Sequence, residues 1–243
     1  MPPDLKRLLA ILKGRVLGSF ERRSYSQEGE DMILRRLFDH RRTGFYVDVG
    51  AHHPLRYSNT YFFYRLGWRG INIEPNPDIA LAFRVFRPRD LHVQMGVAEA
   101  AGKLTYYRFN DAALNTFDGA LARRREQTTA YRVLSTLEVP VERLRTILEE
   151  QLPPGTAIDF LSVDVEGLDL AVLRSNDWTR FRPTCVLAEA LGVSSVEHLL
   201  QSKLARLLRD HGYRFFAKSF NTAFFLDRQW SRPAQRAEMG SAR

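Results

Sequence analysis

Acidic side chains stand at the ends of several apolar segments that are typical of β-strands. Residues 45–49 form one such segment, in which Asp48 is followed by Gly50, and the next segment ends in Glu74. In open α/β folds, ligands bind where parallel strands end, and an acid roughly 20–25 residues after a glycine turn hydrogen-bonds the ribose of an adenosine-containing ligand. The turn at Gly50 lacks the further glycines of the G-x-G-x-x-G dinucleotide pattern. The spacing therefore favours a cofactor site of the adenosine type over two ordinary strand-exit turns.

A second group of acids follows two later apolar segments. Asp164 and Glu166 alternate at the end of one, and Glu189 ends the other. Side chains two apart on a strand share a face, so Asp164 and Glu166 could both face a cleft, while Glu166 could instead cap the next helix. Carboxylates gathered at one sheet edge suit a base for a substrate hydroxyl, a hydrogen-bonding clamp or an oxygen-ligand divalent metal.

Two histidines, His52 and His53, follow Gly50 directly. A histidine there could act as a base near neutral pH, although packing or a backbone hydrogen bond would explain it equally well. We predict Asp164 as the base, because a strand would hold it rigidly. His52 is the alternative, since imidazole has the better intrinsic pKa but follows a flexible glycine turn.

Short β-type segments alternate with helical ones from residue 45 onward, which is typical of a mostly parallel sheet covered on both faces. Only residues 218–221 separate the last two segments, which is too short for a crossover and predicts an antiparallel hairpin. The predicted fold class is therefore α/β, with a mostly parallel seven-stranded sheet and an antiparallel C-terminal hairpin. A further hairpin is expected at 104–109 and an arginine-rich helix around 123–125. The predicted strands are 45–49, 70–74, 91–97, 158–164, 184–189, 213–217 and 222–226.

The predicted organisation has three parts: an N-terminal amphipathic helix within 1–23, a main domain over 24–230 and a polar tail over 231–243. The apolar stripe of residues 4–20 is expected to pack on the domain or on a second subunit, in a homo-oligomer, with peripheral membrane contact as the alternative.

A second helix is predicted to start near Ser26, which can cap it. Glu28, Glu30 and Asp31 place negative charge in its first turn. Ile33, Leu34, Leu37 and Phe38 would form its apolar face.

The 243 residues include 36 basic and 28 acidic ones, a formal charge of +8 that favours anionic partners without choosing among them. One cysteine, Cys185, cannot form an internal disulfide, and no apolar run suggests a signal peptide or a membrane span, so we expect a cytoplasmic protein. The arginine tract at 123–125 is typical of a solvated helix face. Together with Arg132, Arg143 and Arg145 it could instead hold an anionic acceptor.

Five sequence blocks, taken together and in this order, resemble the FkbM-type family of S-adenosylmethionine-dependent methyltransferases. The helix before them and the tail after them carry none of its motifs. The blocks are SQEGED at 26–31, FYVDVGAHHP at 45–54, SNT at 58–60, GWRGINIEPN at 67–76 and DVEG at 164–167.

The resemblance implies a Rossmann-like class I methyltransferase fold and S-adenosylmethionine as cofactor. Asp48, Gly50 and Ala51 would line the methionine end of the cofactor, and Glu74 would take the ribose hydroxyls. The remaining cofactor residues implied are Ser58, Asn59 and Thr60 at the start of the adjoining helix, and Pro75 and Asn76 near the adenine.

Relatives of this kind mostly methylate hydroxyl groups, which implies an O-methyltransferase acting on a saccharide, a glycolipid or a glycosylated natural product. Some related enzymes hold magnesium with an acid at the position of Asp164 and two consecutive acids at the next strand end. Here that end reads Glu189-Ala190, so one acid is missing. Both a metal-free site and a magnesium site with Asp164 and Glu189 stay open.

Two other functions stay open as alternatives: an RNA methyltransferase, and a binding protein that keeps the cofactor fold without catalysis. Net positive charge suits RNA, but no basic motif interleaved with aromatic residues supports nucleic acid as the partner.

Overall fold

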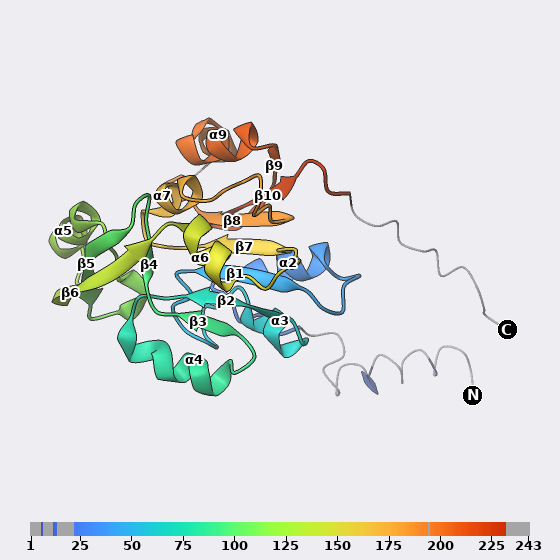
Figure 1. The fold of residues 1–243 in the computed structure, drawn as a ribbon, viewed down its shortest axis with the longest axis horizontal. Coiled ribbons are helices and arrows are strands. Elements are labelled where there is room, and N and C mark those ends of the chain that lie inside the picture. The colour runs from blue at the N-terminus through green and yellow to red at the C-terminus, as the bar shows by residue number, and fades with distance from the viewer. Residues whose placement is uncertain (1–5, 7–11, 14–21, 194, 232–243) are drawn as a thin grey trace.

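A seven-stranded sheet forms the centre of the computed structural model, which describes residues 6, 12–13, 22–193 and 195–231 (Figure 1). All neighbouring strands are parallel except β10, which runs antiparallel to both β8 and β9. The predicted α/β class, seven-stranded sheet and C-terminal hairpin are confirmed. In spatial order the strands are β3 (Leu91–Val93), β2 (Arg69–Ile73), β1 (Phe45–Val49), β7 (Phe160–Val163), β8 (Cys185–Glu189), β10 (Thr222–Asp227) and β9 (Tyr213–Lys218).

Helices cover both faces of this sheet, as continuous apolar strands require. Alternate residues of β1 show the division: Tyr46 packs with residues of α2 and α3, and Val47 packs on the other face with residues of α6, α7 and α9. The helices are α2 (Glu30–Leu37), α3 (Tyr61–Arg65), α4 (Ala80–Phe86), α5 (Gly119–Thr128), α6 (Leu144–Gln151), α7 (Asp169–Arg174), α8 (Val196–Gln201) and α9 (Lys203–Asp210), with short 3-10 turns η1 (Pro77–Ile79) and η2 (Ala112–Leu114).

A second, three-stranded sheet lies beside the first, with α5, at the left of Figure 1. Its order is β4 (Gly96–Val97), β6 (Val133–Glu142) and β5 (Gly102–Phe109). The predicted single strand over 91–97 is wrong, since β3 joins the large sheet and β4 the small one. The short hairpin predicted at 104–109 is also wrong, because β5 pairs with β6 across the whole of α5. Most of β6 is exposed or half-buried, so it lacks the apolar pattern that marks a strand.

The predicted helix cap at Ser26 is wrong. The helix begins at Glu30 with Gly29 at the N-cap, and the Ser26 hydroxyl hydrogen-bonds Asp31 instead. Glu30 and Asp31 are buried rather than solvated. The Glu28 carboxylate accepts hydrogen bonds from the Asn221 amide N–H (2.8 Å) and side chain (2.9 Å), so this segment is tied to the loop between β9 and β10.

The predicted helix over 4–20 and the tail after residue 231 lie outside the described residues, apart from residues 6, 12 and 13. Among the described residues, none of the helices combines the length and the apolar character needed to cross a lipid bilayer.

Phe160 lies in the core beneath the strand ends, and its replacement tests how that core is packed. It is completely buried on β7, and its ring lies 5.0 Å from that of Phe63 and 5.6 Å from that of Tyr46, measured between centroids. We predict that Phe160→Ala lowers the free energy of unfolding by about 3–5 kcal/mol, measured by urea denaturation. Phe220→Ala is the control, because Phe220 is 83% exposed and should change stability by less than about 0.5 kcal/mol. Equal losses in both variants would contradict this account of the core.

Candidate functional site

A cavity opens where β1, β2 and β7 end, and the small sheet covers it from the side. This is the position at which open α/β sheets bind ligands. The residues lining it are Gln27, Val49, Gly50, His52, Tyr57, Ile73, Glu74, Pro75, Met95, Gly96, Val97, Tyr106, Ala112, Ala113, Leu114, Asn115, Thr116, Phe117, Asp164, Val165, Glu166 and Leu168.

Gly50 sets the distance between two of these walls. Its φ is 79°, its N–H donates to the carbonyl of Ile73 (2.9 Å), and a Cβ atom here would lie 1.8 Å from the carbonyl oxygen of Asp164. Any other residue would therefore clash with backbone as well as strain the turn. The glycine lets the end of β1 lie directly against the end of β7.

Glu74 is held in the cavity wall by backbone donors. Its two carboxylate oxygens accept from the N–H groups of His52 and Asn76, each at 2.8 Å. Burial raises the pKa of Glu74 to about 7, although both hydrogen bonds favour the charged form. The carboxyl group therefore changes charge near neutral pH, while each oxygen keeps a further lone pair for a ligand donor.

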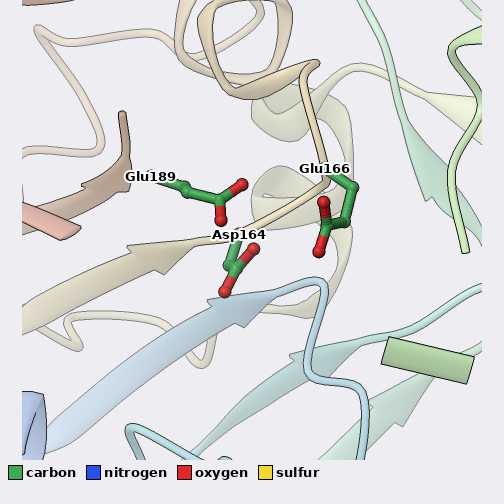
Figure 2. A group of neighbouring side chains, drawn as sticks. All are labelled: Asp164, Glu166 and Glu189. Carbon is green, nitrogen blue, oxygen red and sulfur yellow. The ribbon is translucent and has the colours of Figure 1, made fainter. Parts of the chain in front are cut away.

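Three carboxylates converge at the ends of β7 and β8: Asp164, Glu166 and Glu189 (Figure 2). One oxygen from each lies within 4.8 Å of the other two. Glu166 forms an ion pair with Arg125, whereas Glu189 Oε2 is buried without a hydrogen-bond partner among the described residues. The neighbouring Asp169 accepts from the Glu189 N–H at 3.1 Å.

Burial and the closeness of these acids to one another raise the pKa values of their carboxyl groups. Burial, followed by the charge of Asp164, raises the pKa of Glu189 to about 10, and burial raises that of Asp169 to about 7. The pKa of Asp164 lies well above its usual range because of burial and then Asp169. Such a cluster can accept a proton or bind a cation, and the unpartnered oxygen of Glu189 fits a hard divalent ion.

A smaller cavity lies on the other side of Asp164. It shares Gln27, Tyr57 and Asp164 with the larger one, so Asp164 stands at the junction of the two. Its lining is Gln27, Glu28, Glu30, Tyr57, Asn59, Asp164, Glu189, Asn221 and Thr222.

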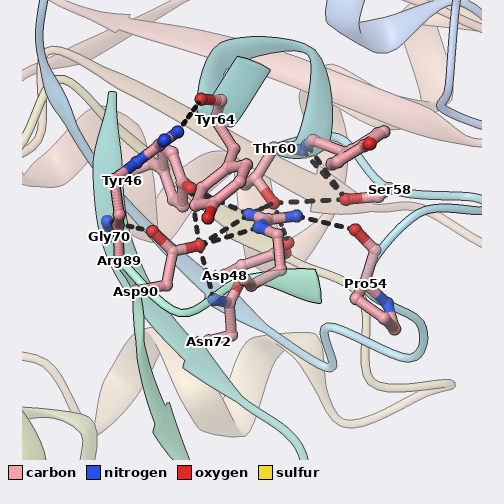
Figure 3. A network of polar contacts seen from close by, with 12 residues as sticks. Tyr46, Asp48, Pro54, Ser58, Thr60, Tyr64, Gly70, Asn72, Arg89 and Asp90 are labelled. Carbon is pink, nitrogen blue, oxygen red and sulfur yellow. Dashed lines mark hydrogen bonds and ion pairs between the residues drawn. The ribbon is translucent and has the colours of Figure 1, made fainter. Parts of the chain in front are cut away.

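Three of the predicted cofactor residues lie behind the walls of the larger cavity. The carboxylate of Asp48 is buried and accepts from the Thr60 hydroxyl (2.8 Å), which in turn accepts from the guanidinium of Arg87 (3.0 Å) (Figure 3). Ser58 belongs to the same region, and its hydroxyl accepts from the N–H of Tyr61 at 3.1 Å. None of Asp48, Ser58 and Thr60 lines the larger cavity.

Two other predicted residues stand next to the cavity and support its walls. Ala51 is buried and donates its N–H to the Ile73 carbonyl (3.3 Å), and Asn76 caps η1 while its N–H holds Glu74. Asn59 faces the smaller cavity and donates to the hydroxyl of Ser162 (3.1 Å). The residues singled out from sequence that line the larger cavity are Gly50, His52, Glu74, Pro75, Asp164 and Glu166.

His52 lies in the wall with its backbone in the left-handed region, at φ 49°. Burial, followed by the neighbouring charge of His53, lowers the pKa of His52 below its ordinary value. Its imidazole is therefore neutral near pH 7 and can accept a proton.

Sequence reasoning missed several lining residues, above all Tyr57, Tyr106 and residues 112–117, which carry no motif. The predicted arginine-rich helix forms as α5, but its arginines and the later Arg132 and Arg143 do not gather at one anion site. Arg125 pairs with Glu166, while Arg132 and Arg143 donate to backbone carbonyls. Glu166 does not cap α7, whose N-cap is Leu168.

The family model described as the methyltransferase FkbM domain matches residues 48–215. A solved TehB-like SAM-dependent methyltransferase from Corynebacterium glutamicum aligns with a TM-score of 0.38 and 12% sequence identity, covering 93% of this chain and 100% of that one. A search of curated sequences gives no significant match.

The carboxyl cluster predicts how stability depends on pH. Glu189 and Asp169 have raised pKa values in the folded protein, so folding takes up protons, and their contribution is complete below the unfolded pKa and is lost as the pH rises toward 10. We predict that the free energy of unfolding falls between pH 5 and pH 9, by up to roughly 1 kcal/mol per pH unit, and that Glu189→Gln flattens this slope.

Urea denaturation at pH 5, 7 and 9 measures the slope, with the exposed Glu150→Gln as control. Magnesium should raise the unfolding midpoint at pH 9 in the wild type and less in Glu189→Gln, because a cation relieves repulsion among the ionised acids. Parallel pH curves for all three proteins would contradict the assignment.

Proposed function

The chain belongs to the FkbM methyltransferase family, and on that premise we propose that it transfers a methyl group from S-adenosylmethionine to a hydroxyl oxygen of a saccharide, glycolipid or glycosylated natural product. The observation that carries this proposal is the position of Asp164, a half-buried residue that lines two neighbouring cavities. One cavity lies where open α/β sheets bind nucleotides, and in this proposal the acceptor approaches Asp164 from the other.

In this proposal the larger cavity holds S-adenosylmethionine, which supplies an electrophilic methyl group on sulfur. Glu74 accepts the ribose hydroxyls, while Gly50 and His52 stand at the methionine end and Pro75 near the adenine. Asp48 and Thr60 act indirectly, since their hydrogen bond lies behind the turn that carries Gly50 and His52. The residues fit this ligand because the buried carboxylate of Glu74 faces the cavity with acceptor capacity to spare.

Asp164 is the base in the proposed reaction. S-adenosylmethionine would supply the electrophilic methyl group when bound, and the Asp164 carboxylate would accept the proton of the acceptor hydroxyl as its oxygen is methylated. Its raised pKa makes it a stronger proton acceptor than an exposed aspartate, provided that the pH is high enough to ionise it. The rigid contact with Gly50 fixes the backbone from which it acts.

A divalent cation is compatible with the same residues. Asp164, Glu166 and Glu189 would hold it through carboxylate oxygens, and it would supply positive charge to orient the acceptor oxygen and lower the pKa of its hydroxyl.

Charge in the smaller cavity supports a saccharide over RNA as acceptor. Its lining has four carboxylates and, among the described residues, no Lys, Arg or His. A phosphodiester would find no cation to pair with there, whereas neutral hydroxyl groups find many acceptors.

The pKa of Glu74 makes cofactor affinity depend on pH. Only the ionised carboxylate binds ribose hydroxyls at full strength, so we predict about tenfold weaker binding of S-adenosylhomocysteine at pH 6 than at pH 8. Glu74→Gln should bind roughly 10- to 100-fold more weakly at pH 8 and lose most of this pH dependence. Calorimetric titration checks both. An unchanged affinity in the variant would remove Glu74 from the role.

Turnover tests the base and the acceptor together. We expect tritiated S-adenosylmethionine to label a glycan or glycolipid in a panel that also holds RNA, and Asp164→Asn to lower that turnover on the order of 10²–10⁴-fold while binding S-adenosylhomocysteine normally. Wild-type turnover should rise with pH as Asp164 ionises.

His52→Ala is the comparison variant, because a large loss there with Asp164→Asn near wild type would assign the base to His52. Labelling of RNA alone would replace the proposed acceptor, and a protein that binds the cofactor but labels nothing would be a binding protein without catalysis.

A further inference from the structure

Tyr57 occupies the boundary between the two cavities, and no motif in the sequence marks it. It lies in the loop between β1 and α3, lines both the larger and the smaller cavity, and is 44% exposed. Its ring therefore stands beside Asp164 at the junction without contributing a buried side chain to the core. An exposed aromatic ring at this place needs another explanation than stability.

The backbone of Tyr57 supports a functional explanation. Its φ is 54°, and the other non-glycine residues with positive φ among the described part of the chain are His52 and Glu166. All three line the larger cavity. A bulky residue in the left-handed region is strained, and the conformation persists where the surrounding structure requires it, most often at a ligand site.

Neighbouring groups hold the loop in this conformation. The N–H groups of Leu55 and Arg56 donate to His53 Nδ1 (3.0 and 3.1 Å). On the far side of Tyr57, the N–H of Ser58 donates to the Tyr25 carbonyl (3.0 Å).

The ring itself is also positioned. The Arg56 guanidinium lies 4.4 Å from its centroid, and the His52 ring is nearly parallel to it at 6.3 Å between centroids. The tyrosine ring is thus presented at the junction in one orientation.

The groups around the ring match the surface of a pyranose. Asn59 and Asn221 offer amides, Glu28 and Glu189 offer carboxylates, and Tyr57 offers an apolar surface. Sugars present C–H groups on the faces of the ring and hydroxyl groups at its edge, so an aromatic side chain beside polar acceptors binds both parts.

We propose that Tyr57 forms the aromatic wall of an acceptor subsite for an uncharged pyranoside, against which the C–H face of the sugar packs while one hydroxyl reaches Asp164. This inference rests on the proposed function and deepens it, because it names the recognition residue and the charge class of the acceptor. No basic side chain among the described residues lines the smaller cavity to pair with a phosphate or a carboxylate, so phosphorylated sugars and uronic acids are disfavoured there.

Binding measurements test this subsite apart from catalysis. The probes are methyl α-D-glucopyranoside, methyl β-D-galactopyranoside and methyl α-L-rhamnopyranoside, with glucose 6-phosphate as the charged counterpart, titrated by NMR into protein saturated with S-adenosylhomocysteine. We expect at least one neutral glycoside to bind wild type and Tyr57→Phe equally, and Tyr57→Asn about two- to tenfold more weakly. Glucose 6-phosphate should bind none of them.

Asn is the chosen replacement because it tolerates positive φ and removes only the ring. The urea midpoint should not fall in Tyr57→Asn, and Tyr131→Asn is the matched control. Tyr131 is likewise part-exposed, at 39%, but lines neither cavity. Equal glycoside affinity in Tyr57→Asn and wild type, tighter binding of glucose 6-phosphate, or no binding by any glycoside would overturn the subsite.

Failure of the subsite and failure of the reaction can be told apart. Glycosides that bind through Tyr57 but are never methylated would support the subsite and contradict the proposed O-methyl transfer. Glycosides that are methylated with the same KM by wild type and Tyr57→Asn would support the reaction and overturn the subsite.

Discussion

The contact between Gly50 and the carbonyl of Asp164 is the constraint on which the site depends. β1 and β7 are neighbouring parallel strands, the N–H of Asp164 donates to the Val49 carbonyl (3.0 Å), and a Cβ at position 50 would collide with the Asp164 backbone. Because glycine has no Cβ, the two strand ends can meet. The turn that carries His52 lies on one side of this contact, and the carboxyl group of Asp164 lies on the other. A larger residue would separate the cavity wall from the proposed base.

A second constraint is the cost of burying charge. Asp164, Glu166 and Glu189 lie together at the sheet edge, and Arg125 is the cation that pairs with this cluster among the described residues. The other carboxyl groups avoid this cost by staying protonated, as the raised pKa of Glu189 indicates. The result is a region rich in acidic residues in a chain of net charge +8, so the overall charge does not describe this end of the sheet.

The buried guanidinium of Arg87 holds the turn after β1 from the side away from Asp164. It donates to the Pro54 carbonyl (2.9 Å), the Tyr46 hydroxyl (2.8 Å) and the Thr60 hydroxyl, and it forms an ion pair with Asp90. Loop, strand and helix are thus joined through one side chain that is 1% exposed. Because a buried charge with several fixed partners is costly to disturb, this network gives the turn after β1 a defined position.

The sequence by itself determined most strands of the large sheet, its antiparallel end and the residues at the strand ends, because strand period and turn chemistry are local properties. Glu74 and Asp164 could be named as site residues for that reason. Only the tertiary structure decided that β5 pairs with β6 across α5, that Asp48 faces a buried arginine rather than the cavity, and that Tyr57 stands at the junction. Pairing between distant segments, the face a strand-end side chain occupies and a positive φ imposed by neighbours all depend on packing, which no local pattern encodes.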